Sequence, residues 1–194
     1  LFVEKNTGIN DDLNGVERPV GFTATSLGDK QLEIVQSLAK WKRLRLSQLT
    51  AGVNEGLYVD MRALRPDEEV SSTHSIYVDQ WDWEKVLDAS SRTIDYLKTQ
   101  VTHIYTALKR TELFLAEHAG IDPILPQQVT FIHSEDLLEL YPELTPKQRE
   151  DKIASLHGAV FIIGIGHALA DGKEHDLRSP DYDDWSTAVD GKRG

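Results

Sequence analysis

Two neighbouring segments of the chain place polar side chains on strand faces that are otherwise apolar. Every second residue of each segment falls on one face, because side chains alternate along a strand. These faces read Leu57, Val59, Met61, Ala63 and Arg65 in the first segment, and Ile76, Val78, Gln80 and Asp82 in the second. A buried charge is costly unless it is paired or meets a ligand. We therefore expect the two strands to pair and to form the floor of a polar pocket that contains Arg65, Gln80 and Asp82.

The length of the chain, 194 residues, suits one domain with a sizeable core. Its longest apolar run, residues 159–165, is far shorter than the about 20 residues that a membrane-spanning helix needs. No signal peptide is visible at the start. These features predict a soluble, cytoplasmic protein that has no membrane partner. The chain begins at Leu1 and its one methionine is Met61, so we expect a single domain over residues 1–194 that is incomplete at the N- and C-termini.

Net charge and cysteine content exclude several functional classes. The formal net charge is −11, and a protein whose main partner is nucleic acid needs a basic surface instead. A small anionic ligand in a local basic pocket remains compatible with this charge. The chain has no cysteine, which excludes disulfides, thiolate zinc sites and cysteine nucleophiles in this chain.

Hydrophobic periodicity predicts strands and helices without strict alternation. We expect helices at 37–49, 89–119, 134–141 and 145–158, and strands at 32–36, 57–65, 75–83, 129–133 and 159–165. Residues 1–20 and 166–187 are expected to form loops, because turn-forming residues cluster there. The sequence Thr145-Pro146-Lys147-Gln148 is typical of a capped helix start. This order favours an α+β fold with a mainly antiparallel sheet flanked by helices.

Three further segments carry more polar residues than their positions require. The first, residues 7–15, includes Asp11, and the competing interpretation is a solvated turn. In the second, residues 37–43, Lys42 would point back toward the sheet and meet an anion, with Ser37 close by; the alternative is a basic surface helix. The third, residues 178–186, has three aspartates within four positions. They could bind a divalent cation or an ammonium group, or form an acidic surface loop.

Other familiar catalytic patterns are missing from the sequence. Four histidines could act as general bases, but no spacing in the sequence gives any of them a partner, so structural or surface roles are expected for His74, His133, His167 and His175. Gly164-Ile165-Gly166 lacks the third glycine of a dinucleotide-binding turn. No Walker-type loop, zinc-ligand spacing or G-x-S-x-G motif is present. The sequence therefore assigns no metal ligands.

Four long motifs resemble ammonia-dependent asparagine synthetases, the aspartate–ammonia ligases of bacteria. They are SLAKWKR at 37–43, NEGLYVDMRALRPDE at 54–68, HSIYVDQWDWE at 74–84 and DGKEHDLRSPDYDDWS at 171–186, and the resemblance covers nearly the whole chain. It implies a catalytic core like that of class II aminoacyl-tRNA synthetases and a homodimer. It also implies that ATP, assisted by Mg²⁺, activates the side-chain carboxylate of L-aspartate as an adenylate. Ammonia would then displace AMP to give L-asparagine.

The resemblance also implies a role for each polar residue of the pocket. Arg65 would contact the α-phosphate, and Lys42 would neutralise a carboxylate of aspartate; these two are the expected catalytic residues. Ser75 would lie near the nucleotide. The remaining substrate-binding residues would be Asp11, Ser37, Gln80, Asp82 and Asp183. Family members continue beyond this C-terminus into acidic metal-binding positions and an arginine that grips ATP. The alternative is therefore a truncated, non-catalytic module that binds aspartate or regulates; aspartyl transfer to tRNA is disfavoured by the acidic charge.

Overall fold

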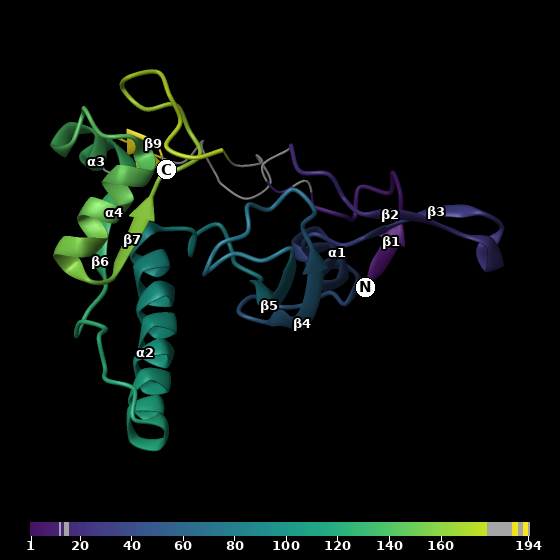
Figure 1. Cartoon of the computed structure of the whole chain (residues 1–194), viewed down its shortest axis with the longest axis horizontal. Helices are drawn as coiled ribbons and strands as arrows, with labels where there is room; N and C mark the ends of the chain where they lie inside the picture. The colour runs from purple at the N-terminus through teal and green to yellow at the C-terminus, as the bar shows by residue number, and fades with distance from the viewer. Residues whose placement is uncertain (12, 14–15, 178–187, 190–191, 194) are drawn as a thin grey trace. The chain divides into compact units, whose positions relative to one another are not determined.

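A computed structural model describes residues 1–11, 13, 16–177, 188–189 and 192–193. By its internal contacts the chain divides into two compact units, Leu1–Ala89 and Ser90–Gly194. Figure 1 shows strands in both units and the long helix α2 in the second. The fold is mixed α and β, with small antiparallel sheets and helices. The single domain over residues 1–194 and the class II core stay predictions.

The first unit begins with a three-stranded antiparallel sheet in the order β1-β3-β2. Its strands are β1 (Phe2–Glu4), β2 (Gly21–Ala24) and β3 (Lys30–Ile34), and the short 3-10 helix η1 (Thr25–Leu27) follows β2. The sequence predicted a loop over residues 1–20, so β1 was missed. It has three residues and pairs with β3 from far along the chain, Phe2 facing Ile34. Local periodicity carries no signal for such a pairing.

The next two strands of this unit form the antiparallel pair that the sequence predicted. Strands β4 (Gly56–Leu64) and β5 (Tyr77–Lys85) place Met61 opposite Gln80 and Val59 opposite Asp82. The helix α1 (Ala39–Gln48) packs against both strands. A small apolar core lies between them, formed by Val35, Leu38, Met61 and Ala63. The polar face of β5 therefore continues directly from the core.

The second unit contains the helices α2 (Ile94–Ala119), α3 (Ser134–Leu140) and α4 (Pro146–His157) and the strands β6 (Thr130–His133) and β7 (Val160–Ile163). Strands β6 and β7 pair in parallel, which differs from the antiparallel sheet expected. The crossover through α3 and α4 permits this pairing. Among the described residues β7 pairs with β6 alone and is half-buried, although its apolar sequence suggested a central strand. Residues Ala188–Val189 (β8) and Lys192–Arg193 (β9) also pair, antiparallel.

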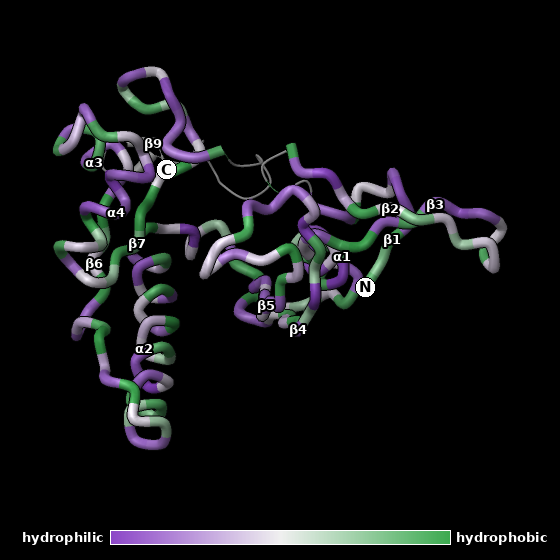
Figure 2. The backbone as a smooth tube through the Cα atoms, viewed as in Figure 1, coloured by the Kyte–Doolittle hydropathy of each residue, from purple (hydrophilic) through white to green (hydrophobic). Residues whose placement is uncertain are grey.

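Helix α2 carries many apolar residues but buries few of them. Figure 2 shows hydrophobic and hydrophilic residues alternating around this helix. Tyr105 is its buried residue, and its hydroxyl donates to the Pro126 carbonyl at 2.7 Å. Leu97, Ile104 and Leu108 are exposed.

The start of α4 offers a stability test. The Thr145 side chain accepts from the Gln148 N–H at 3.3 Å, and Gln148 Oε1 accepts from the Thr145 N–H at 2.9 Å. Thr145→Ala removes one of these bonds and should destabilise the protein by about 1 kcal/mol, the usual cost of losing such a cap. Urea unfolding measures this loss, and Thr145→Ser should retain most of the stability. An alanine variant as stable as the wild type would show that the cap contributes nothing.

Candidate functional site

Lys42 is the largest fully buried side chain among the described residues, and α1 positions it. The buried residues of α1 are Ala39, Lys42 and Leu46, three and four residues apart, so they share one face of the helix. This face packs on β4 and β5. The Lys42 side chain is 0% exposed and its Nζ lies 2.5 Å from Asp82 Oδ2 on β5. The structure thus places a lysine and a carboxylate together on the polar face.

Asp11 lies at the start of the same helix. Its buried carboxylate accepts through Oδ2 from the Ala39 N–H at 2.9 Å and from the Lys40 N–H at 3.4 Å. A negative charge stabilises the N-terminus of a helix, whose first N–H groups lack partners within the helix. The N-cap residue is Leu38, which forms no side-chain cap, and Ser37 Oγ accepts from the Ala39 N–H at 3.2 Å. Asp11 therefore supplies the charged cap from a distant loop.

Four buried polar atoms of this unit have no hydrogen-bond partner among the described residues. They are Asp11 Oδ1, Gln36 Nε2, Lys42 Nζ and Arg65 Nε. Lys42 has its ion pair with Asp82, but the contact lacks hydrogen-bond geometry. A buried polar group without a partner costs about 1–3 kcal/mol. Three of these atoms are hydrogen-bond donors, and Asp11 Oδ1 is an acceptor. A ligand that carries both anionic and cationic groups would fit them.

The other predicted site residues occupy the same strands or the loop between them. Gln80 is half-buried on the face that carries Asp82. Arg65 directly follows β4, is half-buried, and its N–H donates to the Ile76 carbonyl at 2.9 Å. Ser75 is exposed, and its Oγ accepts from the Tyr77 N–H at 3.3 Å. The pairing confirms that Gln80 and Asp82 share a face with Met61 and Val59, and the place of Arg65 on that face stays a prediction. Asp183 and the acidic segment 178–186 lie outside the described residues.

Glu84 belongs to this cluster and was missed from the sequence. It lies on β5 two residues after Asp82, half-buried and opposite Leu57. Extending the alternation of the strand by one step would have found it. Burial raises the pKa of the Glu84 carboxyl above its usual value. The positive charges of Lys42 and Arg43 counteract this rise in pKa in part, and the negative charges of Asp82 and Asp11 add to it. Glu84 thus lies within electrostatic range of two cations, Lys42 and Arg43, and of two other carboxylates, Asp82 and Asp11.

The raised pKa of Glu84 predicts a pH-dependent stability. The native protein holds the Glu84 proton more tightly than the unfolded chain, so this contribution to stability is full below the unfolded value of about 4.3 and is lost as the pH rises through the native value. Glu84→Gln should therefore be more stable than the wild type at neutral pH and equally stable below that window. Chemical unfolding of both proteins across this pH range measures the difference. A less stable variant at neutral pH would mean that attraction to Lys42 and Arg43 outweighs burial.

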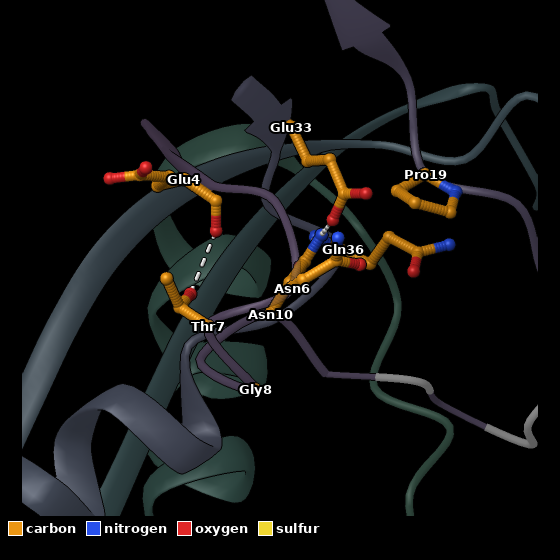
Figure 3. Close-up of a pocket in the computed structure, with 8 residues that line it drawn as sticks. All are labelled: Glu4, Asn6, Thr7, Gly8, Asn10, Pro19, Glu33 and Gln36. Atoms are coloured by element: carbon orange, nitrogen blue, oxygen red, sulfur yellow. Dashed lines mark hydrogen bonds between the residues drawn. The ribbon is translucent and has the colours of Figure 1, made fainter. Parts of the chain in front are cut away.

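The structure has a pocket of about 390 Å³, and some of its lining residues are sequence neighbours of the cluster residues. It is lined by Glu4, Asn6, Thr7, Gly8, Asn10, Pro19, Glu33 and Gln36 (Figure 3). Asn10 and Gln36 directly precede Asp11 and Ser37, the two residues that hold the Ala39 N–H. The pocket and the lysine–carboxylate cluster therefore share two chain segments.

The histidines of the second unit contact carboxylates and backbone. His133 Nδ1 accepts from the Glu135 N–H at 3.2 Å and caps α3, and His175 Nε2 lies 3.2 Å from Glu150 Oε1. Buried His167 lies 3.9 Å from Glu135. In the first unit, exposed His74 bonds to the hydroxyls of Ser71 and Thr73.

The described residues contain neither a metal-binding cluster of side chains nor a membrane-spanning helix. No group of three or more His, Cys, Asp or Glu side chains is placed to hold a metal ion in this part of the chain. No helix in the same part of the chain has the length and apolar character to cross a membrane.

Comparison with known proteins agrees with the resemblance seen in the motifs. The family model for aspartate–ammonia ligase matches residues 1–191. An aspartate–ammonia ligase of Parabacteroides distasonis is 57% identical over 100% of this chain and 57% of its own length. Those of Bacteroides fragilis and Clostridium perfringens are 56% and 54% identical over 96% of this chain, and over 54% and 56% of their own lengths. The chain thus spans little more than half of these relatives, and it belongs to the aspartate–ammonia ligase family.

Proposed function

We propose that this protein is an ATP-dependent ligase that converts L-aspartate and ammonia to L-asparagine through a β-aspartyl-adenylate, releasing AMP and pyrophosphate. Family membership supports the reaction. The observation that carries the assignment to this site is buried Lys42, which pairs with Asp82 at 2.5 Å and lies on the helix that Asp11 caps. Lys42 matches a carboxylate of the substrate, and Asp82 and Asp11 match its α-ammonium group.

The cluster suits aspartate in one orientation. Lys42 would pair with a substrate carboxylate, since its Nζ has no hydrogen-bond acceptor among the described residues. The α-ammonium group would meet Asp82, the free Oδ1 of Asp11 and the amide oxygen of Gln80. Ser37 would add a hydrogen bond, and Asp183 would complete the amino-group contacts. The cluster contains more carboxylates than lysines, and this negative charge favours binding of the α-ammonium group.

Arg65 suits the first chemical step. An oxygen of the aspartate side-chain carboxylate attacks the α-phosphorus of ATP, and the bond to the pyrophosphate leaving group breaks. The half-buried guanidinium, whose Nε has no partner among the described residues, would stabilise the charge on the α-phosphate by charge-assisted hydrogen bonds. Ser75 would lie near the nucleotide. Mg²⁺ would enter bound to ATP, and we assign it no ligand in this chain.

The second step needs no protein nucleophile. Ammonia attacks the carbonyl carbon of the adenylate, the bond to the AMP oxygen breaks, and the nitrogen loses a proton as the amide forms. The contribution of the protein is to position the two reactants and to stabilise charge. We also propose a class II synthetase-like core, a homodimer and a cytoplasmic location, which are inferences from the sequence.

Product analysis tests the reaction. The complete protein that contains this chain, incubated with ATP, Mg²⁺, aspartate and ammonium chloride, should form AMP and asparagine in equal amounts, and omission of aspartate should stop both. The non-catalytic alternative predicts aspartate binding by calorimetry without AMP formation. Formation of ADP in place of AMP would overturn the adenylate mechanism.

A further inference from the structure

The pocket beside the cluster has an acidic and amide lining. Its polar side chains come from Glu4, Asn6, Thr7, Asn10, Glu33 and Gln36, and no lysine or arginine lines it. Glu4 pairs with Lys30 at 2.8 Å. No lysine or arginine of the described chain pairs with Glu33, whose Oε2 accepts from Asn10 Nδ2 at 3.4 Å (Figure 3). The lining thus offers carboxylate charge to a small cation.

Gln36 is a second and independent indication of a ligand. Its side chain is 1% exposed, yet Nε2 has no hydrogen-bond partner among the described residues. In Figure 3 the side chain extends below Glu33 toward Pro19. Its backbone N–H donates to Asn10 Oδ1 at 2.9 Å, which holds the Asn10 side chain beside Gln36 in the pocket wall. A buried amide without a partner is costly, so a bound polar group would stabilise this arrangement.

We propose that this pocket binds the ammonium ion that supplies the amide nitrogen. This inference rests on the proposed function and concerns binding alone. The carboxylate of Glu33 accepts a hydrogen bond from the ion, and its charge concentrates the cation near the site. The Gln36 amide serves both protonation states, because its oxygen accepts from ammonium and its N–H donates to the lone pair of ammonia.

The position of the pocket suits this use. Asn10 and Gln36 are pocket residues, and the residues that follow them, Asp11 and Ser37, belong to the proposed aspartate site. An ammonium ion bound by Asn10 and Gln36 would therefore contact the residues that directly precede Asp11 and Ser37, which are assigned to aspartate. The α-ammonium group of an amino acid has the same chemistry, so the test separates it from the free ion.

Glu33→Gln in the complete protein tests the proposal. The KM for ammonium chloride should rise about tenfold or more, as expected for loss of a hydrogen bond to a charged group, at constant pH and ionic strength. The KM values for aspartate and ATP should stay unchanged. Asp29→Asn is the matched control, because it removes an exposed negative charge from the turn before β3 and should leave all three KM values unchanged.

Three results would overturn the proposal. An unchanged KM for ammonium would show that Glu33 does not bind it. A rise in the KM for aspartate instead would mean that the pocket holds the α-ammonium group of an amino acid. Loss of aspartate-dependent pyrophosphate exchange, measured without ammonia, would give Glu33 a role before ammonia enters. If the wild-type protein formed no AMP, the proposed function itself would fail, a result distinct from these three.

Discussion

Lys42→Met should raise the KM for aspartate by about 100-fold or more, since one charge-assisted contact in such a site contributes about 2.7–4 kcal/mol. Methionine keeps most of the side-chain volume on the buried face of α1, so the change tests charge and not packing. The KM for ATP should change much less. Initial rates of AMP formation at varied aspartate concentration measure the effect.

Arg45→Met is the matched control for this prediction. Arg45 is an exposed cation on the same helix and bonds to Gln48 Oε1 at 3.2 Å, so its loss should not change the aspartate KM. Thermal unfolding of both variants separates a folding defect from a binding defect. An aspartate dependence in Lys42→Met that matches the wild type would remove Lys42 from the substrate site.

Arg65→Ala should lower kcat for AMP formation by about 100- to 1,000-fold, because it removes a group assigned to charge that develops in the transition state. Arg65→Lys should recover little of this rate, since an ammonium group cannot reproduce the planar, bidentate contacts of a guanidinium. Single-turnover measurement of AMP formation at saturating aspartate reports the chemical step directly.

Arg62→Ala is the matched control for Arg65. Arg62 lies on β4 three residues before Arg65, on the exposed face, and its Nη1 lies 2.6 Å from Asp60 Oδ1. Its removal should leave kcat within about twofold of the wild type, as is usual for a surface ion pair of small energetic weight. Normal turnover in Arg65→Ala would contradict the catalytic role of this arginine.

Local patterns predicted much of the site. The two-residue period of β4 and β5 gave the shared face of Met61, Gln80 and Asp82, and the antiparallel pairing confirms it. Long helices and the cap at Thr145 also follow from neighbouring residues. These features depend on interactions within a few positions of the chain.

The features that the sequence did not predict depend on distant contacts. The hydrogen bond from the Ala39 N–H to Asp11 joins residues 28 positions apart, and no local signal distinguishes this aspartate from its neighbours in a polar turn. The same holds for the pairing of β1 with β3 and for the pocket between Glu4, Glu33 and Gln36. Glu84 is different, because it lies two residues after Asp82 on the same strand. The two-residue alternation of side chains therefore predicts that both lie on one face.

We propose that this protein activates aspartate as an adenylate, with Lys42 and Arg65 in the site. The most direct test is aspartate-dependent exchange of labelled pyrophosphate into ATP, measured without ammonia. We expect exchange in the wild-type protein, with a strong reduction in Arg65→Ala and a much higher aspartate requirement in Lys42→Met. Exchange that proceeds without aspartate, or that both variants retain at the wild-type rate and aspartate concentration, would contradict this proposal.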